Sequence, residues 1–271
     1  MSVSEKIHQR MQQLGIQPKK SLGQNFLISH HVIDRIVEAA KEFQPKSILE
    51  IGPGLGSLTD PLKDLGIAYK LLELDHVFCD YWRGQGLDVW EGDALHFPWN
   101  QLPNISGTLL VSNLPYQISS SIVIDRSMDA DPCCGMILMF QKEVAQRIRA
   151  KSGNDDYGML SVIAQSFWKI KKLIDAGPRE FFPPPKIASQ VLVFEPLPWS
   201  LGSKEKFLKL VKASFLHRRK LVCRNWEEAL SLPVDAGKEF LRSRQLSETA
   251  RAEEMSLEDF HAMSVWMESG V

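Results

Sequence analysis

The stretch Leu110–Tyr116 reads Leu-Val-Ser-Asn-Leu-Pro-Tyr, and the rest of the chain can be interpreted outward from it. β-Branched and aliphatic residues at 108–111 predict a buried strand that leads into this stretch. Pro115 ends such a strand, because its ring fixes φ and removes a backbone donor. The sequence therefore predicts that a strand gives way abruptly to a turn over residues 113–116.

This turn offers hydrogen-bond acceptors beside an aromatic ring. Asn113 supplies a side-chain acceptor, and Tyr116 supplies a ring with a polar tip. Leu114 precedes a proline and prefers an extended backbone, which can turn its carbonyl outward. Two acceptors beside a flat ring suit the exocyclic amine of a planar base. Asn and Pro are also common in ordinary turns, so the neighbouring motifs must decide between the two interpretations.

Composition limits the class of protein. The chain has 271 residues, of which 44% are hydrophobic and 24% charged, which is typical of one large or two modest globular domains. The formal net charge is −1, so any nucleic-acid surface must be local. The four cysteines lack metal-ligand spacing, and we expect reduced thiols and no metal. Without a signal-peptide core or a bilayer-length apolar run, the expected location is cytoplasmic.

Short apolar segments alternate with segments of helical periodicity. This alternation predicts an α/β fold with a mostly parallel sheet that helices cover on both faces. The strands are expected at 47–51, 69–74, 88–90, 108–111 and 136–140, with a final pair at 171–175 and 190–194. The helices are expected at 30–43, in a segment ending at Leu65, at 143–149 and at 160–167. Residues 1–28 are expected to form a solvated arm anchored by Phe26 and Leu27.

The C-terminal part has a different character. Pro196-Leu197-Pro198 predicts a linker, so we divide the chain into domains at 1–200 and 201–271. Residues 204–225 are rich in Lys and Arg, whereas acidic residues predominate in 226–271. The second domain is therefore expected to be small and helical, with one basic element. That element could be a solvated amphipathic helix, a surface for nucleic acid, or both.

A glycine pattern indicates a nucleotide-binding loop. Gly52, Gly54 and Gly56 follow the strand expected at 47–51. The dinucleotide fingerprint needs its third glycine one position later, where Ser57 stands. Glu50, two residues before the first glycine, is an awkward neighbour for a pyrophosphate. Both features favour a cofactor with a nucleoside but no phosphate, and S-adenosylmethionine fits.

Two further carboxylates follow neighbouring strands. Glu73 lies 21 residues after Gly52, where a carboxylate that accepts from both ribose hydroxyls is expected. Asp93 follows the next strand and could accept from the adenine amine. Either carboxylate alone could simply cap a turn or a helix. Glycine and acidic residues at three successive strand ends instead predict a cofactor pocket at the carboxyl edge of the sheet.

Several motifs together resemble one enzyme family. They lie at 20–27 (Lys-Ser-Leu-Gly-Gln-Asn-Phe-Leu), 50–54 (Glu-Ile-Gly-Pro-Gly), 73–75 (Glu-Leu-Asp), 92–94 (Gly-Asp-Ala), 113–116, 141–144 (Gln-Lys-Glu-Val), 157–162 and 181–186 (Phe-Phe-Pro-Pro-Pro-Lys). In this order they resemble the ribosomal RNA adenine N6,N6-dimethyltransferase family, and most closely its bacterial small-subunit (16S) branch. The resemblance covers nearly the whole chain.

The resemblance implies a fold, a reaction and partners. The fold would be that of class I S-adenosylmethionine-dependent methyltransferases, Rossmann-like with a mostly parallel seven-stranded sheet, plus a small all-helical C-terminal domain. The reaction would be dimethylation of two adjacent adenosines near the 3′ end of 16S ribosomal RNA during subunit maturation. The partner would be that RNA or an immature small subunit, bound by a monomer without membrane association.

The resemblance also implies site residues. The N-terminal residues 1–28, and above all 19–28, would be a flap over cofactor and target. Phosphate contacts dominate RNA affinity, so Arg218, Arg219 and Lys220 in the basic element are expected to bind RNA. Cofactor contacts are expected at Asn25, Leu27, Gly52, Gly54, Glu73, Asp93 and Asn113.

A mechanism follows as a hypothesis. Hydrogen bonds from the adenine amine to the Asn113 side chain and the Leu114 carbonyl would free the nitrogen lone pair for methyl transfer. Tyr116 would stack on the target base, with Phe181 as a second candidate, and such stacking is worth about 1–3 kcal/mol per base. No metal or dedicated general base is required.

Three alternatives remain open. A large-subunit (23S) adenine N6-methyltransferase would share the Asn-Pro-Tyr logic. A non-catalytic RNA-binding assembly factor could keep the fold. A nicotinamide oxidoreductase would share the glycine-rich loop, although Ser57 and the turn at 113–116 disfavour it.

Overall fold

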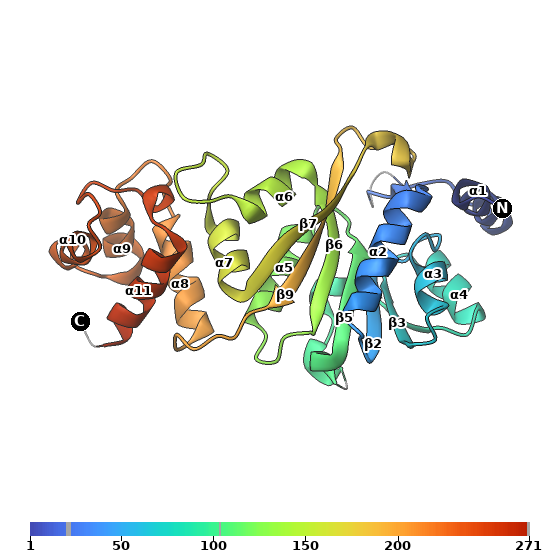
Figure 1. Cartoon of the computed structure of the whole chain (residues 1–271), viewed down its shortest axis with the longest axis horizontal. Coiled ribbons are helices and arrows are strands. Elements are labelled where there is room, and N and C mark those ends of the chain that lie inside the picture. The colour runs from blue at the N-terminus through green and yellow to red at the C-terminus, as the bar shows by residue number, and fades with distance from the viewer. Residues whose placement is uncertain (20–22, 103, 270–271) are drawn as a thin grey trace. The chain divides into compact units, whose positions relative to one another are not determined.

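A computed structural model describes residues 1–19, 23–102 and 104–269 of the chain (Figure 1). The chain forms two compact units. Unit 1 comprises residues 1–145 and 170–196, and unit 2 comprises 146–169 and 197–271. Unit 2 includes the segment 146–169, which the sequence division assigned to the first domain. The functional boundary at residue 200 stays a prediction.

Among the described residues, seven strands form one sheet in the order β4-β3-β2-β5-β6-β9-β7. Neighbouring strands from β4 to β6 run parallel, and β9 runs antiparallel to β6. The mostly parallel seven-stranded sheet is therefore confirmed. The strands are β2 (Ser47–Ile51), β3 (Ala68–Glu73), β4 (Asp88–Glu91), β5 (Thr108–Asn113), β6 (Gly135–Gln141), β7 (Trp168–Ala176) and β9 (Ser189–Pro196).

The strand order contains a reversal point. From β2 the chain continues outward to β3 and β4, and then returns to the other side of β2 to form β5 and β6. In open α/β sheets, ligands bind outside the carboxyl ends of the strands where the order reverses. The glycine loop follows β2, and Asn113 ends β5. The reversal point therefore brings together the two motifs on which the sequence interpretation rests.

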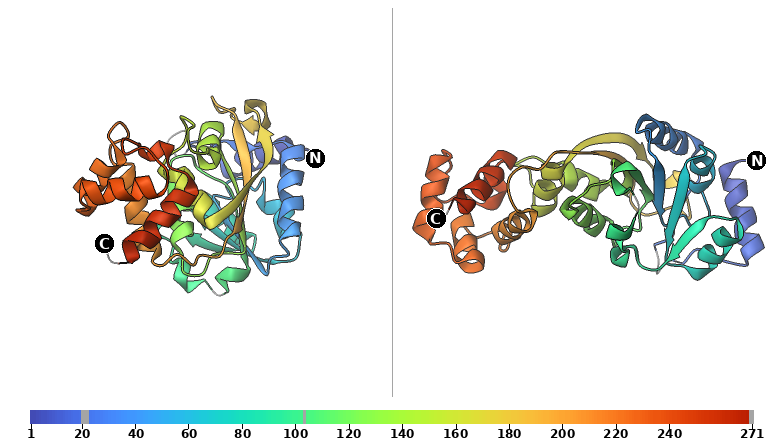
Figure 2. Two further views of the ribbon diagram at one scale, coloured as in Figure 1. Left: turned by 60° about the vertical axis from the view of Figure 1, so that its left-hand side comes forward. Right: turned by 90° about the horizontal axis from the view of Figure 1, so that it is seen from below.

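Helices lie on both faces of this sheet (Figure 2). Helix α2 (His30–Glu42) starts at Ser29, whose hydroxyl accepts from the Val32 N–H at 3.4 Å. Its apolar side, including Val32 and Ile36, packs in one buried cluster with residues of β2, β5 and β6 such as Val111. The predicted helix is confirmed, and burial of its apolar stripe is what attaches it to the sheet.

The expectation of a solvated arm over residues 1–28 is wrong for its first half. Residues Val3–Leu14 form helix α1, which begins with a capping box between Ser2 and Glu5. Ile7 and Met11 are buried in a cluster that includes aromatic residues of α4 (His76–Gly84). Two apolar residues one turn apart are too sparse a pattern to reveal a helix among so many polar neighbours.

The helix expected to end at Leu65 is shorter than predicted. Helix α3 spans Thr59–Lys63, and the Gly66 N–H donates to the Lys63 carbonyl at 3.1 Å. The residues before it belong to the turn that the glycines make. The other helices are α5 (Ser119–Met128), α6 (Lys142–Arg149), α7 (Met159–Phe167), α8 (Lys204–Ser214), α9 (Val222–Leu230), α10 (Val234–Ser243) and α11 (Leu257–Glu268).

Unit 2 has its own aromatic core. Phe207, Trp226, Phe240 and Phe260, from α8 to α11, are almost completely buried. The Trp226 indole N–H donates to the Ser214 hydroxyl at 2.7 Å, which satisfies the polar atom of the largest of these side chains. The C-terminal region is therefore helical, as predicted, and its basic helix buries an apolar side.

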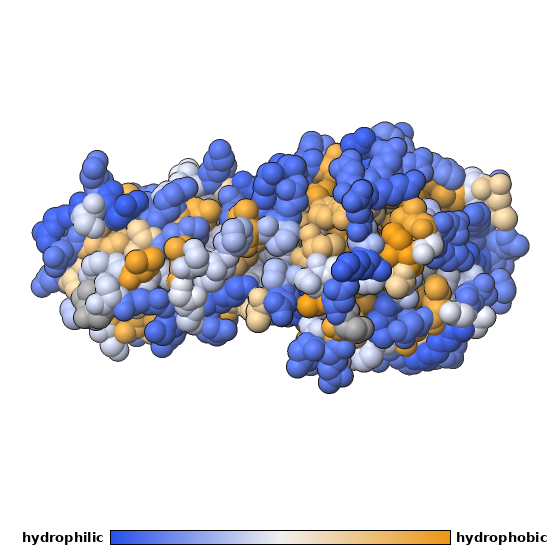
Figure 3. Space-filling model, turned by 60° about the horizontal axis from the view of Figure 1, so that its bottom comes forward, coloured by the Kyte–Doolittle hydropathy of each residue, from blue (hydrophilic) through white to orange (hydrophobic). Residues whose placement is uncertain are grey.

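The surface is largely hydrophilic on the side shown in Figure 3, with apolar patches interspersed. All four cysteines are free thiols. Within the described ranges, no helix combines the length and apolar character needed to span a membrane.

Gly56 provides a test of the packing beneath the glycine loop. Its φ is +86°, and an added Cβ would lie 2.4 Å from Arg10 and 2.6 Å from Trp82. We expect Gly56→Ala to lower the free energy of unfolding by roughly 2–5 kcal/mol, from left-handed backbone strain and overpacking. Urea denaturation measures this change.

Gly84→Ala is the matched control. This glycine ends α4, and an added Cβ would have no atom within 4 Å. The substitution should leave the protein as stable or stabilise it by up to about 1 kcal/mol. Equal losses in the two variants would contradict the packing described for Gly56.

Candidate functional site

The glycine loop is held by side chains from two distant helices. Gly52 and Gly54 adopt left-handed φ values of +68° and +50°, which only glycine adopts at little cost. The Trp82 indole N–H donates to the Gly54 carbonyl at 2.9 Å. Arg10 donates to the Leu55 carbonyl at 2.7 Å and pairs with Asp60 at 2.8 Å. Sequence analysis missed both supports, because nothing local links α1 or α4 to this loop.

Glu50 is a buried carboxylate beneath the loop. Its side chain accepts hydrogen bonds from the Thr59 and Tyr69 hydroxyls, both at 2.7 Å and both on Oε2. Burial raises the pKa of Glu50 to about 7, although these two hydrogen bonds oppose the shift, and the charges of Glu73 and Asp60 raise it further. The group therefore changes charge near neutral pH. The sequence pointed to Glu50 only as unfavourable to phosphate.

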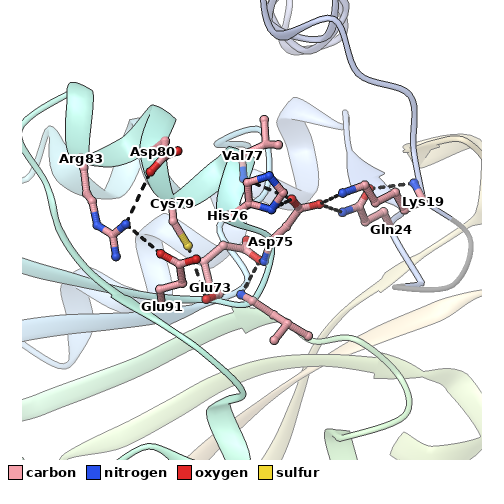
Figure 4. Close-up of polar contacts among 11 residues, drawn as sticks. Lys19, Gln24, Glu73, Asp75, His76, Val77, Cys79, Asp80, Arg83 and Glu91 are labelled. Atoms are coloured by element: carbon pink, nitrogen blue, oxygen red, sulfur yellow. Dashed lines mark hydrogen bonds and ion pairs between the residues drawn. The ribbon is translucent and has the colours of Figure 1, made fainter.

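Glu73 connects the end of β3 to the glycine loop. One oxygen accepts from the backbone N–H groups of Leu74 at 2.7 Å and Asp75 at 2.9 Å (Figure 4). The other accepts from the Gly54 N–H at 3.3 Å. Burial raises the pKa of Glu73, while these hydrogen bonds oppose the rise. A carboxylate offers about four acceptor positions, so Glu73 keeps acceptor capacity toward a ligand.

Asp93 serves as a cap and also faces the site. It follows β4, and its Oδ1 accepts from the Leu95 N–H at 3.0 Å at the start of a short 3₁₀ helix. Its side chain is 41% exposed. The capping role that the sequence left open is therefore real, and it leaves part of the carboxylate accessible.

The turn at 113–116 is fixed by hydrogen bonds at both ends. The Asn113 amide donates to the Asn25 carbonyl at 3.0 Å, so the amide oxygen is left as an acceptor. The Tyr116 hydroxyl lies 2.9 Å from the Ser189 hydroxyl, and burial raises its pKa. Pro115 lies 3.9 Å from where a Cβ on Gly52 would stand. The turn therefore adjoins the glycine loop.

These elements enclose a cavity of about 280 Å³ in unit 1. Its described lining includes the carboxylates Glu50, Glu73 and Asp93 and contains no Lys, Arg or His. Such a lining favours a cationic ligand and disfavours phosphate groups. The predicted site residues that line it are Asn25, Leu27, Gly52, Gly54, Glu73, Asp93, Asn113, Leu114 and Tyr116.

Phe181 is not among the described residues that line the cavity. It lies in β8 (Phe181–Phe182), which pairs antiparallel with β1 (Phe26–Leu27), and its side chain is only 3% exposed. A ring packed in the core cannot stack on a base without leaving that core. This buried position does not support the stacking role predicted for Phe181. Residues 20–22 of the predicted flap lie outside the described residues.

The predicted RNA-binding residues lie in unit 2 between α8 and α9, and all three are exposed. Arg218 pairs with Glu253 at 3.0 Å, and Lys220 pairs with Glu228 at 3.0 Å. Arg219 has no ion pair with another described residue. Of the three, Arg219 is therefore the side chain whose charge is least compensated within the protein.

Lys19 and Gln24 form hydrogen bonds with the residue that caps the start of α4. Asp75 caps this helix and accepts from Lys19 at 2.8 Å and from Gln24 at 3.4 Å (Figure 4). Burial raises the pKa of Asp75, but the hydrogen bonds from Lys19 and the Val77 N–H outweigh this effect and leave the pKa below its ordinary value. The segment before β1 is thus anchored next to the cavity.

Lys19→Met tests this anchor. A lowered pKa means that Asp75 adds stability above its unfolded value of about 3.9, and that this stability is lost as the pH falls through the folded pKa. The variant should raise the pKa of Asp75 in a ¹³C-carboxyl NMR titration. It should also destabilise the protein by about 1 kcal/mol or less, since Lys19 is 44% exposed.

The stability difference from wild type should begin to shrink as the pH falls below the unfolded value of about 3.9, and it should vanish only below the lowered folded pKa of Asp75, where the group is protonated in both proteins. Lys6→Met is the control, because Lys6 makes no ion pair within the described part of the chain. An Asp75 pKa that is the same in Lys19→Met and in the control would show that the ion pair does not form in solution.

Comparisons with known proteins agree with this geometry. The family model for ribosomal RNA adenine dimethylase matches residues 15–269. A Bdellovibrio bacteriovorus protein named ribosomal RNA small subunit methyltransferase A is 49% identical over 267 residues, with 97% of each chain covered. A Desulfitobacterium hafniense protein of the same name is 35% identical, with 92% of each chain covered.

Two solved structures share the fold. A dimethyladenosine transferase from Plasmodium falciparum superposes with a TM-score of 0.70 at 24% identity, covering 90% of this chain and 96% of that one. The 23S rRNA methyltransferase ErmE gives a TM-score of 0.63 at 22% identity, covering 90% and 98%. The predicted class I methyltransferase fold is confirmed. The family match and the full-length relatives show that this chain belongs to the ribosomal RNA adenine dimethylase family.

Proposed function

We propose that this chain transfers methyl groups from S-adenosylmethionine to the N6 amine of adenosines in small-subunit (16S) ribosomal RNA. The observation that carries the proposal is the cavity, in which carboxylates from three strand ends and no described cationic side chain adjoin the Asn-Leu-Pro-Tyr turn. Family membership supports the reaction, and the names of the full-length relatives support the small subunit as target.

The lining fits the proposed cofactor. S-adenosylmethionine carries a sulfonium and an ammonium group, and a cavity lined by carboxylates lowers the free energy of such cations. Glu73, at the end of β3, would accept from the ribose hydroxyls, and Asp93, after β4, would accept from the adenine amine. When bound, the cofactor supplies an activated methyl group.

The turn would hold the target amine. The Asn113 side-chain N–H donates to the Asn25 carbonyl. This hydrogen bond leaves the Asn113 side-chain oxygen as an acceptor for the target amine. Together with the Leu114 carbonyl, this oxygen would accept from the adenine N6–H groups and make the nitrogen lone pair available. Fixed placement of two reactants can contribute as much as about 7–11 kcal/mol in intramolecular models. No side chain is needed as a general base, because the methylated ammonium product is acidic.

The target base must leave its stack to reach the turn, which costs a few kcal/mol. Tyr116 lines the cavity, and its ring is held through the hydroxyl by Ser189. Stacking of the extruded base on this ring would stabilise the bound RNA by about 1–3 kcal/mol. Contacts between the RNA backbone and the exposed Arg219 would supply part of the remaining binding free energy.

A methyl-transfer assay tests the function. Labelled cofactor is the methyl donor, and small subunits that lack the modification are the acceptor. We expect wild-type protein to yield N6,N6-dimethyladenosine after digestion to nucleosides. Asn113→Ala should reduce the rate by about 10²–10³-fold, because one of the two oxygens that orient the amine is lost. The dissociation constant for S-adenosylhomocysteine should rise much less than the rate falls, as calorimetry can measure.

The matched control is Asn100→Ala, which removes an exposed asparagine amide from a short 3₁₀ helix of unit 1, Trp99–Gln101. It should leave both quantities unchanged. A wild-type rate in Asn113→Ala would exclude the amine clamp. Methylation of large subunits alone would favour the 23S alternative, and cofactor binding without any transfer would favour the assembly factor.

Arg219→Glu tests the basic segment. We expect weaker binding to 16S RNA fragments of any sequence and a decrease of about 1 in the slope of log K against log salt, because one phosphate contact is lost. Fluorescence anisotropy at several salt concentrations gives both values. Lys41→Glu, an exposed charge reversal on α2, is the control. An unchanged slope in Arg219→Glu would remove this residue from the interface.

A further inference from the structure

Tyr69 is not among the described residues that line the cavity, but one hydrogen bond links it to Glu50, which does line it. Its hydroxyl donates to Glu50 Oε2 at 2.7 Å, from the neighbouring strand β3. The same oxygen accepts from Thr59 at 2.7 Å. Its hydrogen bond to Glu50 links Tyr69 to the site, and neither the glycine pattern nor the family resemblance indicated this role.

The strand order assigns Glu50 to one end of the cofactor. The sheet order β3-β2-β5 places Glu50 on β2, between Glu73 at the end of β3 and Asn113 at the end of β5. If Glu73 and Asp93 hold the nucleoside and the turn faces the methyl group, Glu50 is the lining carboxylate left for the amino-acid end. An ammonium group there would need an ionised partner.

We propose that Tyr69 is a positioning residue for the cofactor, whose hydroxyl keeps the Glu50 carboxylate ionised and oriented to receive the ammonium group of S-adenosylmethionine. The inference rests on the proposed function, since it takes its ligand from there. It assigns to Tyr69 an effect on cofactor affinity that acts entirely through Glu50.

The surroundings of Glu50 explain why a hydroxyl donor is needed. From β3 it faces Tyr69 and the acidic Glu73, and from α3 it faces Thr59 and the acidic Asp60. Asp60 is itself paired with Arg10 from α1. β5, the other neighbour of β2, contributes no titratable side chain. The two hydroxyls are therefore the groups that favour the ionised form.

Tyr69 remains a donor throughout the relevant pH range. Burial and the nearby Glu50 charge raise the pKa of Tyr69 well above its ordinary value. The pKa of Glu50, raised to about 7, means that the carboxylate is ionised above neutral pH and is progressively protonated below it. Removing the Tyr69 hydroxyl should raise the pKa of Glu50 further, because a hydrogen bond to the charged form is lost.

The test compares two ligands over pH 5.5–7.5. S-adenosylhomocysteine carries the ammonium group, whereas 5′-methylthioadenosine has the same nucleoside without the amino acid. For wild-type protein we expect the affinity for S-adenosylhomocysteine to fall about fivefold from pH 7 to pH 6, and to approach a tenfold fall per pH unit below pH 6. The affinity for 5′-methylthioadenosine should stay constant.

In Tyr69→Phe the affinity for S-adenosylhomocysteine should still be rising at pH 7.5, and it should be weaker than wild type by about ninefold at pH 6, about fivefold at pH 7 and about threefold at pH 7.5. A ¹³C-carboxyl NMR titration of the unliganded variant should place the Glu50 pKa about one unit higher. Tyr157→Phe is the control. The Tyr157 hydroxyl is also buried, but it has no hydrogen-bond partner among the described residues and Tyr157 does not line the cavity.

Three results would overturn the inference. One is that wild-type protein binds S-adenosylhomocysteine and 5′-methylthioadenosine with the same dependence of affinity on pH. This comparison uses wild-type protein alone, so it does not depend on whether a variant folds. Another is a loss in Tyr69→Phe by the same factor at every pH or for both ligands, which would indicate a merely structural role. The third is failure of wild-type protein to bind either ligand, which would overturn the proposed function as well.

Discussion

Parallel, in-register pairing of β2 with both β3 and β5 is the constraint on which the site depends. The pairing aligns Glu50 with Leu71 on one side and with Val111 on the other. The chain therefore leaves all three strands at the same edge. Because the strand order reverses at β2, the loops after these strands diverge and leave room for a ligand between them. Without this register, the glycine loop, Glu73 and the turn at 113–116 would not face a common cavity.

Burial of acidic groups gives this cavity its chemistry. Glu50 and Glu73 are almost inaccessible to solvent, and each is stabilised by hydrogen-bond donors instead of a cationic side chain. Donors of this kind keep a carboxylate available to a ligand, whereas a lysine or arginine partner would neutralise it. The lining thereby favours a cationic ligand over one that carries phosphate groups. In the same arrangement, two hydroxyl donors, Thr59 and Tyr69, favour the ionised form of Glu50.

The N-terminal segment supports the cavity structurally. Arg10 on α1 supports the glycine loop from outside, and β1 pairs with β8 directly before α2. Lys19 and Gln24 are bonded to Asp75, next to the end of β3. Residues that sequence analysis considered a polar arm therefore surround the cavity on one side. Their position also explains why Asn25 can receive the Asn113 amide.

The sequence by itself determined the strands, the glycine loop and the order of the motifs, because periodicity, glycine spacing and proline act locally on the backbone. Such patterns identified seven residues that line the cavity, including Asn113, Glu73 and Asp93, and the family resemblance added Asn25 and Leu27. Only the tertiary structure decided which distant side chains support them. Arg10, Trp82, Thr59 and Tyr69 reach the site through contacts that no local pattern encodes, and Phe181 is buried because β8 pairs with a strand more than 150 residues earlier. Such long-range contacts depend on how the elements pack against one another, which one-dimensional patterns do not specify.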